Sequence, residues 1–183
     1  MYDVGYVAFL ETDVRGSLDA FRAMVEESPA GSLVNDALRL MLVVSDADES
    51  GDTGPLSLLA DAHAARLRWD SAAARASLTE LTASHGGTSA AVEGLMLLAL
   101  VAEDDGDEET ALAIYGRVVS ETTSLAARAQ AMLRSGELLE AAGRRDEALA
   151  AYTGVLEELP SNFLSGEARR RIDRLRRGGG LEG

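Results

Sequence analysis

The pattern of apolar and polar positions along the chain repeats with a period of 37 residues. The segment from Gly106 to Tyr115 returns as the segment from Gly143 to Tyr152, with glycine, alanine and tyrosine at the same offsets. A unit of this length cannot bury its apolar side alone and does so by stacking on its neighbours. The pattern therefore predicts a helical solenoid.

Each unit is predicted to be a pair of antiparallel helices. In the clearest unit the first helix spans 124–142 and ends at Gly143, because glycine adopts the left-handed C-terminal cap without steric cost. Asp146 and Glu147 favour the start of the second helix through its dipole. Pro160 ends that helix near residue 159, because proline has no amide hydrogen.

Shifting this frame along the chain predicts one all-α domain over residues 1–177, a right-handed superhelical solenoid of about ten helices. Residues 45–54, which follow an additional helix predicted near 32–44, have no apolar periodicity and are expected to form an exposed, mobile acidic loop. The arginine-rich far face of the last helix suits a solubilising cap. The predicted parts are repeats at 1–30, 55–85, 88–123 and 124–160, an additional helix near 32–44 with the acidic loop 45–54, a cap helix at 161–177 and a disordered tail at 178–183.

Composition supports the helical prediction and disfavours nucleic acid and anionic membranes as binding partners. Apolar residues make up 46% of the 183 residues and prolines number only 3, which favours a globular helical chain. No apolar run of about 18 residues is present, so no membrane span is predicted. The net charge of −14 predicts that nucleic acid and anionic membranes repel the chain. All 17 basic residues are arginine, and several of them cluster in 169–177.

Residues at fixed places in these units resemble the tetratricopeptide repeat. That family has a small residue within the first helix, glycine at the turn, alanine early in the second helix, an aromatic residue four positions later and a terminal proline. Gly136, Gly143, Ala148, Tyr152 and Pro160 match one full unit. The other matches are Ala99, Gly106, Ala111 and Tyr115 with Thr123 for proline; Ala62, Ala74 and Leu78 with Trp69 for glycine; and Gly5, Phe21 and Pro29.

The resemblance implies a protein that binds other proteins. The long period and the serine after Pro160 also resemble the bacterial subgroup found in outer-membrane-assembly and cell-envelope proteins. In the family frame Met1 falls on the fourth position of the first helix. The chain is therefore expected to be cytoplasmic if Met1 is the native start, and periplasmic or in the cell envelope if it is a fragment of a longer exported protein.

Candidate chemistry is sparse. His63 and His85 are the only histidines and lie on separate elements without cysteine, so neither predicts a metal site. The acidic loop lacks the terminal glutamate of a calcium loop. No catalytic triad order or phosphate loop is present, so we predict neither a cofactor nor an enzyme. A hydrolase or metal site hidden within residues 32–54 is the remaining enzymatic alternative.

The resemblance also implies a concave groove lined by first-helix side chains, which change from aromatic to acidic along the chain. Because the lysine and asparagine clamp of some relatives is absent, a basic or amphipathic protein segment is the expected guest. The alternative is that several of these side chains only pack against the neighbouring helix. The mapped residues are Tyr2, Tyr6, Phe9, Leu59, His63, Arg66, Met96, Leu100, Glu103, Leu133, Glu137 and Glu140.

Two predictions concern the ends of this surface. At the acidic end Glu137 and Glu140 are expected to be exposed and to attract a basic guest. At the aromatic end a truncated first helix is expected to expose Tyr2, Tyr6 and Phe9. This exposure favours a rival function, self-association by end-to-end stacking into a homo-oligomer.

Overall fold

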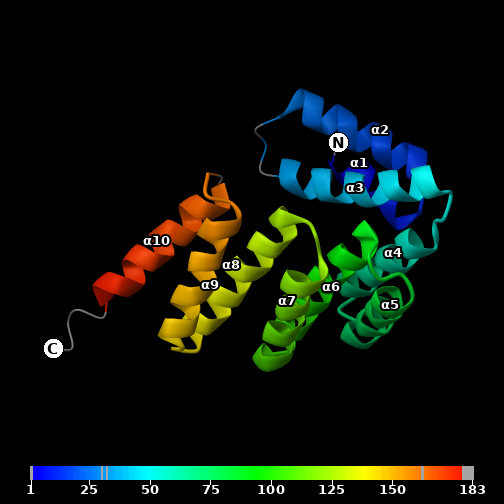
Figure 1. Cartoon of the computed structure of the whole chain (residues 1–183). Coiled ribbons are helices and arrows are strands. Elements are labelled where there is room, and N and C mark those ends of the chain that lie inside the picture. Colours follow the sequence, from blue (N-terminus) through cyan, green and yellow to red (C-terminus); the bar gives the residue numbers. More distant parts are fainter. Residues whose placement is uncertain (1, 30, 32, 162, 179–183) are drawn as a thin grey trace. The chain divides into compact units, whose positions relative to one another are not determined.

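The computed structural model describes residues 2–29, 31, 33–161 and 163–178, and this part of the chain is helical without any strand (Figure 1). The predicted all-α class is therefore confirmed. The ten helices of the described residues are α1 (Tyr2–Leu10), α2 (Val14–Glu27), α3 (Val34–Ser50), α4 (Gly54–Leu67), α5 (Ser71–Ser84), α6 (Ser89–Asp104), α7 (Glu108–Glu121), α8 (Leu125–Ala141), α9 (Arg145–Glu158) and α10 (Phe163–Gly178).

The chain groups into two compact units, residues 1–101 and 102–183, where the sequence predicts one domain. The N-terminal unit holds α1–α5 and most of α6, and the C-terminal unit holds the end of α6 with α7–α10. In each unit, helices that follow one another closely in the sequence pack together, as in the pairs α1 with α2, α4 with α5 and α8 with α9. No described helix has the length and apolarity needed to cross a membrane.

The four turns within the helix pairs share one backbone geometry. In each, a residue with positive φ lies between the helices: Thr12 (56°), Trp69 (59°), Gly106 (75°) and Gly143 (73°). The next amide donates to a carbonyl five residues earlier, which is the hydrogen bond of a Schellman helix end. These bonds join Asp13 to Ala8, Asp70 to Ala65, Asp107 to Ala102 and Arg144 to Leu139 at 2.8–3.0 Å. The turn therefore recurs even where glycine does not.

The small residues of the first helices allow close contact with the second helices. A Cβ atom on Gly136 would lie 2.5 Å from the ring of Tyr152, and one on Gly5 would lie 2.7 Å from the ring of Phe21. Both rings are fully buried. These two places require a small residue, because an added methyl group would overlap the ring.

The prediction of an acidic loop at 45–54 is wrong for residues 45–50, because α3 continues to Ser50. Ala47 extends the buried side formed by Leu40, Val43 and Val44, so burial holds the helix together through this segment. The carboxylates that suggested a loop lie around this buried side. Gly51, with φ of 69°, ends the helix in the left-handed conformation.

The last helix takes the place of a first helix in the repeat frame. Ala168 is buried at the position of Ala131, and Ile172 is buried beside it. Asp173, however, is exposed at the position that Gly136 holds in α8. Gly178, which the sequence assigns to a disordered tail, belongs to α10, and the rest of that predicted tail lies outside the described residues.

Candidate functional site

The twelve residues predicted to line a groove lie on first helices of the pairs and divide between the two units. The N-terminal unit contains the aromatic and apolar set: Tyr2, Tyr6 and Phe9 on α1, Leu59, His63 and Arg66 on α4, and Met96 and Leu100 on α6. The C-terminal unit contains the acidic set, with Glu103 on α6 and Leu133, Glu137 and Glu140 on α8.

Four of the predicted residues pack inside the protein. Phe9 and Leu59 are fully buried, Met96 is 5% exposed and Leu133 is 8% exposed. Their side chains contribute to the core, which agrees with the alternative that groove positions can be packing positions. The expected exposure of Phe9 is wrong, and Tyr2 and Tyr6 are half-buried.

In the N-terminal unit, aromatic rings from two first helices form a continuous cluster. Tyr6 stacks between Tyr2 and Phe9 with ring centroids 5.9 Å from each. The ring of His63 meets Tyr6 and Phe9 edge-on at 5.7 and 5.2 Å. The hydroxyl oxygen of Tyr6 lies 2.9 Å from Nδ1 of His63 and fixes the imidazole against α1. These contacts join α1 to α4.

His63 is held in its neutral form. The pKa of His63 is lowered to about 4, chiefly by burial and then by the positive charges of Arg66 and Arg39. Its Nε2 atom is buried without a hydrogen-bond partner among the described residues. A proton added there would be a buried charge facing two guanidinium groups, so the cluster depends on an uncharged ring.

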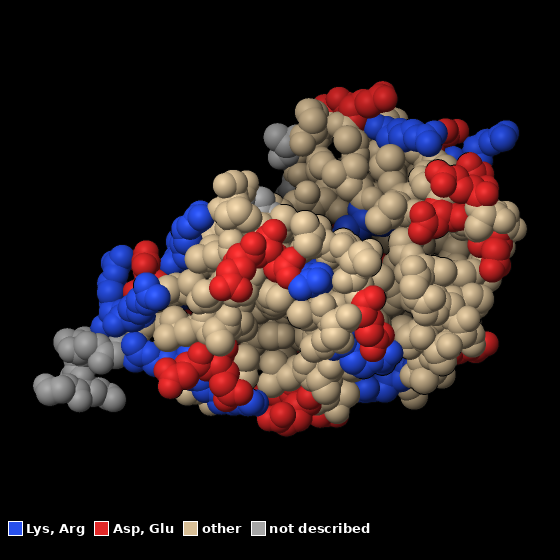
Figure 2. All heavy atoms as spheres, in the orientation of Figure 1, with Lys and Arg blue, Asp and Glu red and all other residues tan. Residues whose placement is uncertain are grey.

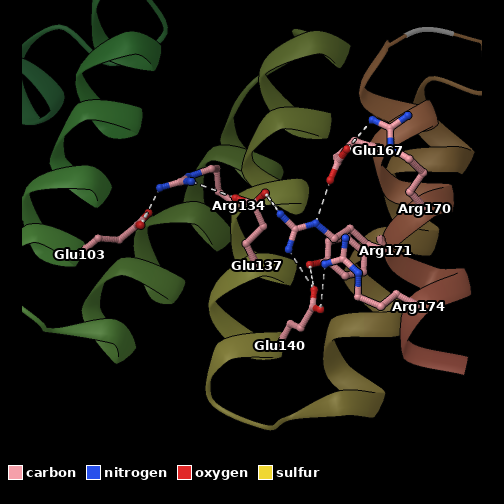
Figure 3. A network of polar contacts seen from close by, with 9 residues as sticks. Glu103, Arg134, Glu137, Glu140, Glu167, Arg170, Arg171 and Arg174 are labelled. Atoms are coloured by element: carbon pink, nitrogen blue, oxygen red, sulfur yellow. Dashed lines mark hydrogen bonds and ion pairs between the residues drawn. The ribbon is translucent and has the colours of Figure 1, made fainter. Parts of the chain in front are cut away.

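The C-terminal unit instead contains a polar network that repeats with the period of the sequence (Figure 3). Glu103 accepts hydrogen bonds from Tyr115 at 2.5 Å and from Arg134 at 2.7 Å. One repeat later, Glu140 accepts from Tyr152 at 2.7 Å and from Arg171 at 3.3 Å. In both sets the glutamate and tyrosine come from one pair of helices, and the arginine comes from the first helix of the next pair.

Glu137 connects the two sets. One of its carboxylate oxygens accepts a hydrogen bond from Arg134 at 2.9 Å, and the other accepts one from Arg171 at 3.0 Å. Arg171 also donates to Glu167 on its own helix at 2.8 Å. The result is a row of alternating charges, Glu103, Arg134, Glu137, Arg171 and Glu140, that crosses α6, α8 and α10 (Figure 3).

These contacts change the expected electrostatics of the acidic set. The side chains of Glu103, Glu137 and Glu140 are only 15%, 24% and 19% exposed, so the prediction that Glu137 and Glu140 are exposed is wrong. Their carboxylates are paired with guanidinium groups rather than free to attract a guest. Burial, together with the hydrogen bond to a carboxylate, raises the pKa of Tyr115 and of Tyr152. Both tyrosines therefore remain hydrogen-bond donors at physiological pH.

Arg134 and Arg171 were not predicted as site residues, although the sequence contains a signal for them. These arginines are separated by the same 37 positions as Glu103 and Glu140 and as Tyr115 and Tyr152. The cluster at 169–177 was interpreted as a solubilising face, which holds for Arg170 and Arg174 at 68% and 64% exposure. It does not hold for Arg171, which is 25% exposed and points into the network.

The face of the molecule shown in Figure 2 has mixed charge, with arginines gathered over α10 and carboxylates in separate groups elsewhere. Among the described residues, no group of three or more histidine, aspartate or glutamate side chains is arranged to hold a metal ion.

Comparison with known proteins identifies one repeat directly. Residues 130–162, which include α9 and most of α8, match the family model of the tetratricopeptide repeat. The solved structure of the MamA protein shares the fold, with 21% sequence identity, a TM-score of 0.50, and coverage of 85% of this chain and 88% of that one. No curated protein sequence matches the chain. The first finding confirms the predicted repeat for residues 130–162, and the second supports the predicted helical fold.

Proposed function

Because the chain is a helical-repeat protein that contains a tetratricopeptide repeat, we propose that it is a non-catalytic scaffold that binds a segment of another protein. The observation that carries this proposal is the repeated helix pair itself, since such arrays present a continuous surface of first-helix side chains. The mixed polar and aromatic side chains described above suit protein recognition.

We place the binding surface on the first helices. In the N-terminal unit it includes Tyr2, Tyr6 and Arg66, which are half-buried and so retain some exposed area. In the C-terminal unit it includes the row of alternating charges from Glu103 to Glu140. A purely basic guest would have to displace Arg134 and Arg171 from their carboxylates. An amphipathic segment that carries both signs of charge can instead add contacts to the row without breaking it.

The test is site-specific photocrosslinking in the source cells. A photoreactive side chain is placed at Arg66 on α4 and at Arg174 on α10, both on first helices. Matched controls carry it at Glu80 on α5 and at Arg117 on α7, which are exposed on second helices of the same two units. Covalent adducts with one protein from the first-helix positions alone would support the proposal.

Adducts from the second-helix positions alone would move the binding surface to the other side of the helix pairs. If none of the four positions yields an adduct, the scaffold function is overturned under those conditions. The cell-envelope subgroup and the compartment remain predictions, which fractionation of the same cells would test.

A further inference from the structure

Trp69 occupies a position that disfavours it. In the two repeats of the C-terminal unit the corresponding residues, Gly106 and Gly143, have left-handed backbones that glycine adopts without strain. Trp69 has the same conformation, with φ of 59°, although its Cβ atom disfavours it. Its side chain is 93% exposed, so no burial offsets this cost. Strain of this kind is retained where a side chain serves a function.

Thr12 shows that strain alone does not identify such a residue. It occupies the equivalent turn of the first repeat with φ of 56°. Its hydroxyl, however, donates to the carbonyl of Glu11 at 2.7 Å, and the side chain is half-buried. Trp69 differs because it presents a large aromatic surface to solvent, and tryptophan is the residue type most often found at the energetic centre of protein interfaces.

The residues around Trp69 form a small apolar and basic surface on an acidic protein. Leu67 is 61% exposed, and Arg68 is exposed between it and Trp69. The nearby carboxylate of Asp70 is engaged locally, because it accepts a hydrogen bond from the amide of Ala73 at 3.0 Å. We call Leu67, Arg68 and Trp69 the tryptophan turn.

The outward side of α3 has the complementary character. Leu38 and Leu42 lie one turn apart and are 47% and 57% exposed, and Asp46 and Glu49 continue the same side toward the C-terminal end. Within α3, all of whose residues are described, no basic residue lies in the last turn. Carboxylates at the negative end of the helix dipole are unfavourable, so this end attracts positive charge. We call Leu38, Leu42, Asp46 and Glu49 the α3 stripe.

We propose that the tryptophan turn of one copy of this protein docks on the α3 stripe of a second copy. Leu67 and Trp69 would cover Leu38 and Leu42, while Arg68 would face Asp46 and Glu49. The charge complementarity argues for a second copy, since a chain of net charge −14 repels itself except where a basic surface meets an acidic one. The two surfaces are different, so the contact is head-to-tail and each copy keeps one free surface for the next.

This proposal does not rest on the scaffold function, and it replaces the stacking through Tyr2, Tyr6 and Phe9 that the sequence suggested. Both surfaces belong to the N-terminal unit. The association is expected to weaken as salt is added, because Arg68 of the turn and Glu49 of the stripe are exposed.

Trp69 itself provides the measurement, because it is the only tryptophan in the chain. As the concentration of the purified protein rises, its emission is expected to shift to shorter wavelength while sedimentation velocity shows larger species. The variant Trp69→Gly is expected to remain monomeric at every concentration. The matched control Thr12→Gly removes the same backbone strain and is expected to associate like the unaltered protein.

A mixing experiment tests the head-to-tail arrangement. The double variant Leu38→Ser with Leu42→Ser alters exposed residues and is expected to remain monomeric when alone. Mixed with Trp69→Gly, it supplies an intact turn to an intact stripe, so the mixture is expected to stop at dimers. A charge-swapped pair, Arg68→Glu with Glu49→Arg, is expected to associate when mixed, although each variant alone associates weakly.

Several results would overturn the proposal. They are a monomeric unaltered protein with unshifted emission at all concentrations, association of Trp69→Gly equal to that of Thr12→Gly, and failure of both mixtures to associate while circular dichroism shows that all variants are folded.

Discussion

The second helices α2 and α9 each place an aromatic ring on a glycine of the preceding helix, but the two rings end in different chemistry. Phe21 lies on Gly5 in the N-terminal unit, and its ring meets that of Tyr2 at 5.8 Å. Tyr152 lies on Gly136 in the C-terminal unit and carries a hydroxyl that donates to Glu140. The packing of ring on glycine is the same in both pairs, but only one of the two rings carries a hydroxyl group.

In the three repeats that have an aromatic ring, the residue four positions after the small residue differs with the type of ring. It is Glu103 or Glu140 where the ring is tyrosine, and it is Phe9 in the repeat whose ring belongs to Phe21. A tyrosine hydroxyl at a buried ring needs an acceptor, and a partly buried carboxylate needs a cation, which Arg134 or Arg171 supplies from the next helix. One added oxygen atom therefore accounts for a set of three linked residues.

The largest expected difference between the units is their response to acid. The pKa of His63 is about 4 in the folded protein, below the ordinary value of 6.5, so protonation favours the unfolded state. This contribution is fully present above pH 6.5 and is lost as the pH falls toward 4, at a total cost of about 3 kcal/mol. The protection factors of amides in α1 and α4, which compare each exchange rate with the intrinsic rate at the same pH, should fall over this range.

The variant His63→Gln should lack this acid-dependent loss, and the control His85→Gln should retain it. If α1 and α4 exchange with the same pH dependence in His63→Gln as in the unaltered protein, His63 is not the group responsible.

A smaller effect is expected at the glycine beneath Tyr152. In Gly136→Ala the added methyl group would overlap the ring, so Tyr152 must shift, and we expect a loss of about 1–3 kcal/mol of stability. Gly116→Ala in α7 is the matched control, because a Cβ atom there meets nothing within 4 Å. That variant should gain about 0.5–1 kcal/mol, since alanine favours helix over glycine. Urea unfolding followed by circular dichroism measures both.

Removing the tyrosine hydroxyls should cost still less. Tyr115→Phe and Tyr152→Phe each lose a hydrogen bond to a carboxylate that keeps its arginine, and we expect a loss of about 1–2 kcal/mol for each. A double-mutant cycle of Tyr152→Phe with Glu140→Gln measures the coupling directly. Additive effects of the two substitutions would show that the contact between them contributes nothing to stability.

The smallest expected effects lie at the turns. Gly143→Ala should lose about 1 kcal/mol, because its φ of 73° is unfavourable for a residue with a side chain. Thr12→Gly should gain about 0.5 kcal/mol by the reverse argument, reduced by the greater flexibility of glycine in the unfolded chain. Thermal unfolding measures the change in melting temperature, which should fall for Gly143→Ala and rise for Thr12→Gly. A melting temperature that falls equally in both variants would contradict the strain at Thr12.

The helical fold could be predicted because the apolar period, the small residues and the turn residues are local signals that agree with one another. The buried state of Phe9, Met96 and Leu133 could not, because a place in a repeat does not reveal what packs over it from a neighbouring helix. The same limit applies to the end of α3. Its acidic residues suggested a loop, and the sequence does not show that Ala47 is buried and continues the helix.

The acidic residues of the candidate site were predicted, but the arginines that pair with them were not. Glu103, Glu137 and Glu140 were found by their place in the repeat, while their partners Arg134 and Arg171 lie 31 to 34 residues away from the acceptors they reach across helices. The direction of an arginine side chain depends on the three-dimensional packing around it. The common spacing of 37 residues was the only sign of the pairing in the sequence.

The linked glutamate, tyrosine and arginine have a consequence for how such a protein can grow. The segment 124–160 contains both parts, because Glu140 accepts from an arginine of the segment that follows and Arg134 donates to a glutamate of the segment that precedes. A duplicated copy of residues 124–160 would therefore carry both the glutamate and the arginine that join consecutive repeats. It could be inserted without a change in either neighbouring repeat. Gene duplication, or an engineer who extends the array, can lengthen the C-terminal unit in this way, whereas the aromatic cluster of the N-terminal unit offers no such interchangeable joint.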